Sequence, residues 1–341
     1  MIVKPHSIEN TLMIVFLLVR INYRAGFVCT LFGDGMGCQM DTIAVTGANG
    51  FLGRHCVKKA LEMGVDVKGI VRRKDAADEV RELGAESIIV KNFDVEAYLR
   101  AFDGCDGVLH LIGIVNERYA TFQDVNVHGT RIVLESAYKS QVSRFVTPSG
   151  LGVDKYGERP WATNDYFWSK REIELMCQSS PVSCVVFRPS YILGPRDELI
   201  PNLVDAILQG TVLVVGTGSA PMQPIFVEDA ATAFMRAVLG WRKRYSTYEL
   251  VGPETITFMD LIPRVAKIME EEGFKVPNYR IHKVLVKEAP EALGISREEI
   301  DVMLCDVLGD FTPFTRDFQI TLTPLDEAIH AAVQHVKEEE V

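Results

Sequence analysis

The sequence has no closely spaced cysteine pair and no excess of positive charge. Its seven cysteines are scattered and odd in number, so neither a metal site nor a disulfide framework is expected. Reduced thiols are typical of a cytoplasmic protein, and we expect the chain there. The 36 Lys and Arg residues face 46 Asp and Glu, a net charge of -10. That balance argues against nucleic acid as a partner and gives no reason to expect attraction to an anionic membrane.

The sequence also lacks an apolar run of the length that spans a bilayer, which takes about 20 residues. A short apolar run covers residues 11–19, between Lys4 and Arg20. It resembles the core of a signal peptide, but no small-residue cleavage site follows it clearly. Met40 directly precedes the first predicted strand, so we favour a misassigned start over a weak signal or anchor. Residues 1–39 are therefore left out of the fold prediction, and no membrane span is expected.

Strand-like and helix-like patterns alternate with short connections between residues 42 and 187, without an internal repeat or a low-complexity linker. Such alternation is typical of α/β proteins, in which right-handed crossovers join parallel strands. We predict a Rossmann-type, doubly wound parallel sheet over residues 41–187. After the first strand, further strands are expected at Val65–Val71, Ser87–Val90, Gly107–Leu111, Arg144–Thr147 and Cys184–Phe187, with helices that include Ala120–Lys139 and Tyr166–Gln178.

Prolines break this alternation after residue 187. Residues 188–341 are expected to form mainly a smaller substrate-binding lobe, interleaved with the Rossmann sheet. Ligands of such sheets bind at the carboxyl ends of the strands, so the lobe should lie over that edge.

A glycine-rich turn, TGANGFLG, follows the first predicted strand and precedes a helix-like segment. Gly47 allows a sharp turn, Gly50 allows close approach of a pyrophosphate, and Gly53 allows tight packing of the helix on the strand. The N–H groups at the helix start would face the phosphates. A tight turn without a ligand can look similar, but the strand before and the helix after favour a dinucleotide site. We predict cofactor contacts from Gly47, Asn49, Gly50, Phe51, Leu52 and Gly53.

The end of the second predicted strand bears on the choice of cofactor. An acidic residue there would hold the ribose hydroxyls of NAD. This chain has Arg72 and Arg73, whose guanidinium groups can pair with the 2′-phosphate of NADP. We therefore expect NADP in preference to NAD, with a solvated basic turn as the alternative.

Tyr166 and Lys170 are four residues apart, so on a helix their side chains share one face. An unperturbed tyrosine has a pKa of about 10. A nearby ammonium and the positively charged nicotinamide ring would favour the phenolate and lower that pKa, which suits proton transfer near neutral pH. The alternative is an amphipathic helix with an exposed lysine and a half-buried tyrosine.

The G-x-x-G-x-x-G spacing of the first turn resembles the extended and atypical short-chain dehydrogenase/reductases, which are NAD-dependent epimerase/dehydratase-like. The likeness extends from about residue 41 to the end through DVNVHGT at Asp124–Thr130, RPSYILGPR at Arg188–Arg196, PIFVEDAA at Pro224–Ala231 and YELVGPE at Tyr248–Glu254. It implies that Tyr166 and Lys170 are catalytic, that Ser149 hydrogen-bonds the reacting oxygen, and that Asn126 supports the lysine. The same likeness implies further cofactor contacts from Asn92, Leu111, Ile112, Gly113, Lys170, Arg188, Pro189 and Ser190.

Within that superfamily, Leu111–Glu117 and Asp310–Ile329 are similar to the atypical branch related to the NADPH-binding accessory subunit of complex I. Three functions follow from the resemblance. The first is an NAD(P)-dependent oxidoreductase that moves hydride between nicotinamide and a carbonyl carbon, with tyrosine as acid/base. The second is an NADPH-binding assembly or regulatory protein with little turnover. The third is a nucleotide-sugar epimerase or dehydratase.

Substrate and partners are less constrained by the sequence. Trp161, Phe167 and Trp168 surround the predicted site, either as core packing or as the wall of a pocket for an apolar or quinone-like small molecule. Helices on one sheet face often pair in this superfamily, so a homodimer is one expectation.

Overall fold

The computed structural model describes residues 42–240, 243–305 and 308–339. Contacts within the chain group residues 39–341 into one compact unit. The apolar run at 11–19 and the predicted start at Met40 lie outside the described residues.

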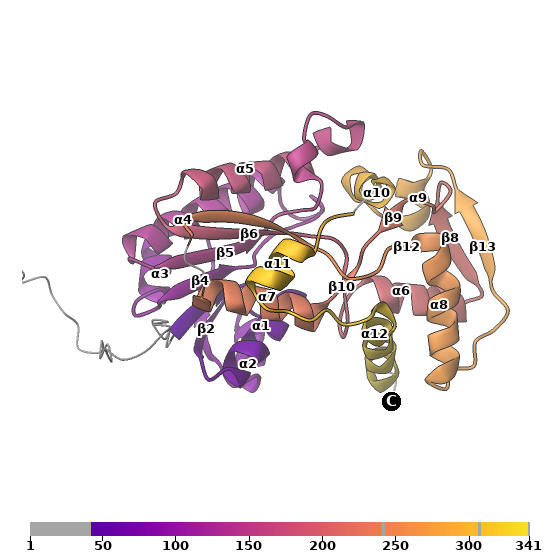
Figure 1. Ribbon diagram of the computed structural model, residues 1–341, viewed down its shortest axis with the longest axis horizontal. Coiled ribbons are helices and arrows are strands. Elements are labelled where there is room, and N and C mark those ends of the chain that lie inside the picture. Colours follow the sequence, from indigo (N-terminus) through magenta and orange to yellow (C-terminus); the bar gives the residue numbers. More distant parts are fainter. Residues whose placement is uncertain (1–41, 241–242, 306–307, 340–341) are drawn as a thin grey trace, which may run out of the picture. The chain divides into compact units, whose positions relative to one another are not determined.

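A seven-stranded parallel sheet forms the centre of this unit, in the order β11-β6-β5-β4-β1-β2-β3 (Figure 1). The central strands are buried on both faces, which explains the apolar run Ile43–Val45 inside β1 and the burial of every residue of β4. The fold class predicted from the sequence is confirmed. The strands span β1 Thr42–Thr46, β2 Asp66–Val71, β3 Glu86–Ile89, β4 Gly107–His110, β5 Arg144–Pro148, β6 Ser183–Pro189 and β11 Tyr245–Leu250.

Helices cover both faces of the sheet. On one face Ala60 of α1 and Phe234 of α7 are buried in the same apolar cluster. On the other face Tyr98 of α3, Leu134 of α4 and Ile173 of α5 belong to a second cluster. The predicted helix at Ala120–Lys139 starts at Gln123, and its first part, Gln123–Gly129, is a π-helix. The helices span α1 Phe51–Glu62, α2 Lys74–Glu82, α3 Val95–Ala101, α4 Thr130–Lys139, α5 Asp165–Ser179 and α7 Val227–Gly240.

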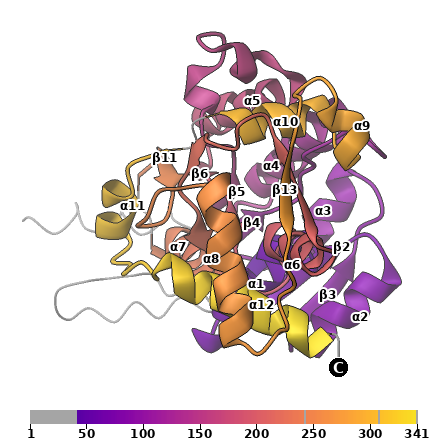
Figure 2. The same cartoon turned by 90° about the vertical axis from the view of Figure 1, so that its right-hand side faces the viewer.

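Most elements after β6, apart from α7 and β11, pack around a third apolar cluster. We call these elements the C-terminal lobe (Figure 2). Its main helices are α6 Leu199–Leu208, α8 Phe258–Glu271 and α12 Leu325–Glu339, beside the parallel pair of β8 Thr211–Val215 and β13 Arg280–Val284. The shorter elements after β6 are β7 Ile192–Leu193, β9 Pro221–Met222, β10 Ile225–Phe226, β12 Ile256–Thr257, α9 Ala289–Leu293 and α10 Arg297–Leu304. Helix α11 Thr312–Asp317 packs instead on β11, and its Phe314 is buried in the same cluster as α1 and α7.

The chain returns to the central sheet after entering the lobe. β11 pairs in parallel with β6, and α7, which precedes it, packs on α1. The sheet is therefore built from residues on both sides of position 187.

Candidate functional site

The carboxyl ends of neighbouring strands bring the predicted site residues to one edge of the sheet. Gly47 follows β1, Leu111 follows β4, Ser149 follows β5, and Pro189 ends β6. These four strands are adjacent in the sheet. Backbone bonds fix the edge, since the Leu111 N–H donates to the Thr46 carbonyl over 3.2 Å and the Ser149 N–H to the Phe187 carbonyl over 2.6 Å.

The glycine turn has no room for side chains at its critical positions. Gly47 has a φ of +70°, which favours glycine, and a Cβ there would lie 3.2 Å from the Leu111 carbonyl carbon. A Cβ on Gly53 would lie 2.1 Å from the Gly47 carbonyl oxygen. Gly50 caps α1 without a side-chain hydrogen bond, and the first turn of α1 has no acidic residue. The N–H groups of that turn therefore remain available to an anion.

The turn after β5 carries Ser149 and passes beside Tyr166. A Cβ on Gly150 would lie 3.3 Å from the Tyr166 hydroxyl oxygen, so this turn passes directly beside the phenol. Ser149 is 2% exposed, and its Oγ has no hydrogen-bond partner among the described residues. A buried hydroxyl without a partner is costly unless a ligand satisfies it. The hydrogen-bonding capacity of the Ser149 hydroxyl is thus unused within the described residues.

Lys170 lies on the same face of α5 as Tyr166, as predicted for a helix. Its Nζ is 5.8 Å from the centre of the Tyr166 ring. Lys170 is 6% exposed, and none of the ion pairs of the described residues involves it. The Cβ position of Gly113 is 3.3 Å from Lys170 Nζ and 3.5 Å from Asn126 Oδ1, so the turn after β4 lies against both side chains.

Asn126 is fixed by three hydrogen bonds from the π-helix. Its Oδ1 accepts from the Ile114 N–H over 2.9 Å, and its Nδ2 donates to the Ile114 carbonyl and to Ser169 Oγ. Asn126 therefore fastens the loop after β4 to α5 beside Lys170. A direct bond from Asn126 to the lysine is not among these contacts.

Burial, not the neighbouring lysine, dominates the electrostatics of the pair. It raises the pKa of Tyr166 to about 12, with the Cys305 thiol as a second cause. It lowers the pKa of Lys170 to about 8. The lowered pKa expected for Tyr166 depended on the Lys170 ammonium together with a bound nicotinamide ring, so it stays a prediction for the protein with its cofactor; in the protein alone, burial raises this pKa.

A neutral histidine, His110, lies between β1 and α4 at the end of β4. His110 is fully buried, and its ring nitrogens lie 2.8 Å from Thr46 Oγ1 and 3.0 Å from Thr130 Oγ1. Burial, followed by the charge of Lys170, lowers the pKa of His110 to about 3. This residue therefore adds no positive charge near the lysine at neutral pH.

Arg72 and Arg73, the two residues predicted to select NADP, differ in whether they form an ion pair. Arg73 forms an exposed ion pair with Asp75 at 2.9 Å. Arg72 is also exposed, directly after β2, and has no ion pair among those of the described residues. Asn92, in the loop after β3, is exposed as well. Arg72 is thus the better placed of the two to meet a phosphate.

The segment after β6 uses its polar groups for internal contacts. Arg188 donates to both carboxylate oxygens of Glu174 over 2.8 and 2.6 Å, which ties β6 to α5. The Ser190 N–H donates to the Leu250 carbonyl. The cofactor contacts predicted for Arg188, Pro189 and Ser190 stay predictions, and the Arg188 guanidinium is already occupied by a carboxylate.

Helix α10 of the C-terminal lobe is hydrogen-bonded to the start of α5 and to the loop after β4, both next to the site. Asn164 Nδ2, at the start of α5, donates to Asp301 over 3.2 Å, and Asn116 Nδ2 donates to Glu299 over 3.3 Å. Arg118 donates to the Gly294 carbonyl over 2.8 Å. These contacts join residues far apart in sequence, which is why the sequence did not predict them.

Two site residues escaped the sequence analysis. Cys305, at the end of α10, and Tyr191, after β6, both lie close enough to Tyr166 to interact with it electrostatically. Tyr191 is part of the RPSYILGPR segment, so that motif pointed toward it. Phe167 is 1% exposed and belongs to the core cluster of the lobe, whereas Trp168 is half-buried. The side chain of Trp161 lies outside the described part of the structure.

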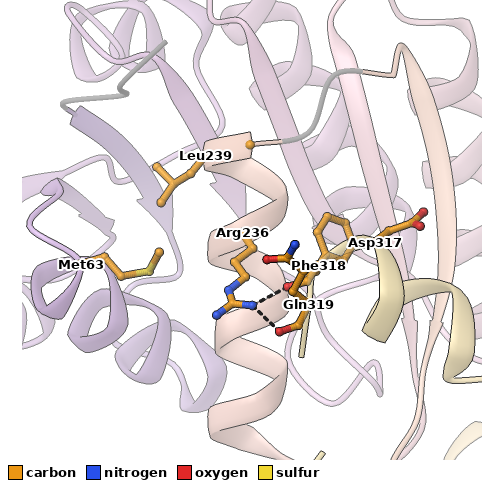
Figure 3. Close-up of a pocket in the computed structure, with 7 residues that line it drawn as sticks. Met63, Arg236, Leu239, Asp317, Phe318 and Gln319 are labelled. Carbon is orange, nitrogen blue, oxygen red and sulfur yellow. Dashed lines mark hydrogen bonds between the residues drawn. The ribbon is translucent and has the colours of Figure 1, made fainter. Parts of the chain in front are cut away.

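A separate surface pocket of about 390 Å³ lies between the end of α1, the end of α7 and the segment after α11 (Figure 3). Arg236 donates there to the carbonyl oxygens of Phe318 and Gln319. Met63, another lining residue, is about 18 Å along α1 from its first residue. This pocket is thus at the opposite end of α1 from the glycine turn.

Within the described ranges, no helix combines the length and apolar character needed to cross a membrane. The same residues contain no group of His, Cys, Asp and Glu side chains suited to a metal ion.

Comparison with known proteins places the chain in a class. A family profile described as the NAD dependent epimerase/dehydratase family matches residues 43–246, which include the glycine turn and the Tyr166–Lys170 pair. The chain belongs to this family, as the sequence resemblance predicted. The Bordetella bronchiseptica enzyme WbmH, solved in complex with NAD+, shares the fold with a TM-score of 0.69 at 23% identity, over 89% of this chain and 100% of that one.

Individual relatives include reductases and a respiratory-chain subunit. The chain is 32% identical over 203 residues to a ceramide reductase of Caulobacter vibrioides, covering 58% of this chain and 62% of the relative. It is 31% identical over 182 residues to a farnesyl-dihydroquinoline-oxide ketoreductase of Stigmatella aurantiaca, covering 48% and 54%. It is 26% identical over 260 residues to subunit 9 of the mitochondrial NADH dehydrogenase alpha subcomplex of Arabidopsis thaliana, covering 72% and 62%. The chain matches less than two thirds of the length of each.

Proposed function

We propose that this protein is an NADP(H)-dependent reductase that converts a carbonyl group to a hydroxyl group. The observation that carries the proposal is the buried, unpartnered Ser149 hydroxyl in the turn that passes beside the Tyr166 phenol. Reductases among the relatives support this direction of reaction.

The glycine turn fits a dinucleotide. Its backbone leaves no space for a Cβ at Gly53, and the uncapped start of α1 presents N–H groups to a pyrophosphate. Arg72 would pair with the 2′-phosphate, which favours NADP over NAD. The buried ammonium of Lys170 would donate to the nicotinamide ribose. When bound, the cofactor supplies the hydride that reaches the carbonyl carbon.

The chain's own residues handle the oxygen and its proton. Ser149 Oγ donates a hydrogen bond to the carbonyl oxygen and holds it beside Tyr166. Tyr166 then donates its phenolic proton to that oxygen as negative charge develops on it. Lys170 stabilises the phenolate left behind, since its pKa of about 8 keeps most of the ammonium protonated at pH 7. The raised pKa of Tyr166 keeps the phenol protonated until negative charge develops on the substrate oxygen.

The decisive experiment compares the Tyr166→Phe variant with the parent on a panel of carbonyl compounds, following NADPH oxidation. The panel holds long-chain 3-oxo acids and long-chain ketones. We expect the variant to lose roughly 10²- to 10⁴-fold in turnover while it binds NADPH as the parent does. Tyr138→Phe, at a 57% exposed tyrosine on α4, is the matched control and should keep full activity. Full turnover by Tyr166→Phe would refute the mechanism.

The similarity to a respiratory-chain subunit favours a second candidate, an NADPH-binding assembly or regulatory protein. Such a protein would bind NADPH tightly and oxidise it with no carbonyl of the panel. Calorimetry with nucleotide sugars tests the epimerase/dehydratase alternative. A cytoplasmic location and a homodimer stay predictions.

A further inference from the structure

A tight turn between β7 and α6 carries backbone strain. The Asp197 N–H donates to the Gly194 carbonyl over 2.9 Å, which closes a turn of four residues. Arg196, the third residue of this turn, has a φ of +74°. Because the second residue is a proline, that φ makes it a type II turn, whose third position favours glycine. An arginine there costs conformational free energy, since its Cβ crowds the backbone.

The other non-glycine residues with a positive φ in the described part of the chain have an ordinary explanation. Gln141 directly follows the cap of α4, and Gln319 directly follows the cap of α11. A left-handed residue commonly ends a helix at that position. Arg196 instead precedes a helix, α6. Strain of this kind persists only where neighbouring contacts hold it, and it is concentrated at binding sites.

His55 of α1 holds the strained peptide in place. Its Nε2 donates to the Pro195 carbonyl oxygen over 3.1 Å, and its Nδ1 lies 2.6 Å from Glu228 Oε1 on α7. The peptide between Pro195 and Arg196 is the one whose rotation converts a type II turn to type I, and only the type II form needs a positive φ. The bond from His55 therefore stabilises the orientation that strains Arg196.

The strained turn lies beside the first turn of α1. Helical side chains lean toward the N-terminus of their helix, and the His55 ring packs edge-on against Phe51 with centroids 5.6 Å apart. The Pro195 carbonyl, which is bonded to that ring, is therefore next to the N–H groups that follow the glycine turn. Since Arg196 directly follows Pro195, its long side chain is within reach of an anion at those groups.

The carboxylates packed around this turn have other partners. Asp197 accepts from two backbone N–H groups of its own segment. Glu228 pairs with His55 and, at 3.6 Å, with Lys59, and the hydrogen bond from His55 lowers the pKa of Glu228. Arg196 is exposed, and none of the ion pairs within the described ranges involves it. Its guanidinium is thus available to an anionic ligand.

We propose that Arg196 binds the pyrophosphate of the nicotinamide cofactor and that His55 is the residue that positions it. A guanidinium pairs bidentately with phosphate oxygens and adds a full positive charge to the partial charge at the start of α1. The strain in the turn is then retained for cofactor binding. In the alternative, only the shape of the turn matters and Arg196 is merely tolerated there. The inference rests on the proposed function for the cofactor, but not for the reaction.

The test combines the affinity for NADPH and for NADH, measured by nicotinamide fluorescence, with the midpoint of thermal unfolding. R196G relieves the strain and removes the cation. We expect its midpoint to rise by about 2 °C while both affinities fall roughly tenfold. R196Q should lower both affinities without the rise in midpoint. R72Q should weaken NADPH alone, because only NADPH has the 2′-phosphate.

The role of His55 is tested by a double-mutant cycle. H55L removes the donor to the Pro195 carbonyl and should weaken both cofactors in the parent. It should weaken them little further in R196G, because the positioned cation is already absent. An equal loss of affinity in both backgrounds would overturn the positioning role.

The matched control is Q141G, which replaces a left-handed residue just before β5, at the edge of the sheet opposite the glycine turn. It should raise the midpoint and leave both affinities unchanged. Parental affinities in R196G would overturn the proposal and leave Arg196 as a tolerated turn residue. Weakening of NADPH alone in R196G would overturn the pyrophosphate contact in favour of the 2′-phosphate. A parent that bound neither cofactor would overturn the proposed function as well, so the two failures are distinguishable.

Discussion

At the scale of the residue, the sequence predicted which side chains meet but not their electrostatics. The four-residue spacing of Tyr166 and Lys170 was enough to place them on one helix face. Their pKa values depend on how deeply the folded chain buries them, and that depth comes from the turns after β4 and β5 and from α10. Those neighbours are distant in sequence, so no local pattern contains the information.

Lys170 should make the folded state pH-dependent. Its folded pKa of about 8 lies below the ordinary 10.5, so between these values the unfolded chain binds the extra proton and stability rises with pH. At pH 7, Lys170→Met should therefore be more stable than the parent by up to about 3 kcal/mol. Urea unfolding from pH 7 to 10 should show this gap closing.

Lys139→Met, at a half-exposed lysine on α4, controls for the loss of a cation in general. It should leave the pH dependence of the parent unchanged. A gap between parent and Lys170→Met that stays constant from pH 7 to 10 would mean that the buried ammonium is not destabilising.

At the scale of the element, the glycine turn was the most predictable part of the molecule. Strand, turn and helix are contiguous, so their packing is encoded within a dozen residues. The hold of α10 on the site is the opposite case, since its partners Asn116 and Asn164 precede it by more than a hundred residues. The sequence predicted the local strand–turn–helix geometry, but it did not predict the contacts that α10 makes with residues far away in the chain.

Gly53→Ala should disrupt the start of α1. Its Cβ would lie 2.1 Å from the Gly47 carbonyl oxygen, and only a backbone shift can relieve that overlap. We expect a loss of about 1–3 kcal/mol in stability together with loss of NADPH binding. Gly240→Ala, with no atom of the described residues within 4 Å, is the control and should do neither. Thermal unfolding and NADPH fluorescence titration measure both effects, and normal cofactor affinity in Gly53→Ala would contradict the role given to this turn.

Asp301→Ala should loosen α10. The change removes the acceptor of the Asn164 amide and the partner of Arg297. We expect faster amide hydrogen exchange over residues 297–304 and a higher KM for a carbonyl substrate, with unchanged exchange in α1. Glu298→Ala, on the same helix, is the comparison, because none of the contacts between α10 and the sheet involves Glu298. Unaltered exchange in Asp301→Ala would show that apolar packing alone holds the helix.

At the scale of the whole molecule, the sequence predicted the type of sheet better than it predicted which residues form all of its strands. The alternation up to residue 187 identified the first six strands. The seventh, β11, lies beyond that alternation: the resemblance of Tyr248–Glu254 to a family segment indicated a strand there, but only the pairing with β6 shows its place in the sheet.

A chain that starts at Met40 should fold and bind cofactor like the full chain. The compact unit covers residues 39–341 and contains every element of the site. We expect equal NADPH affinity for both chains, and equal midpoints of the main thermal transition within about 2 °C. Since 1 kcal/mol corresponds to roughly 2–4 °C in a domain of this size, a larger drop would show that the first 39 residues contribute to stability.

The pairing of β11 with β6 has a consequence for how the protein is made. A ribosome completes β6 about 60 residues before it completes β11, which at 5–20 residues per second is an interval of roughly 3–12 seconds. During that interval the nascent sheet presents the apolar edge Cys184–Phe187 without its final strand. Until β11 is made, this unpaired edge could pair with neighbouring nascent chains on the same polysome. A chaperone that binds exposed apolar strands would act during this interval.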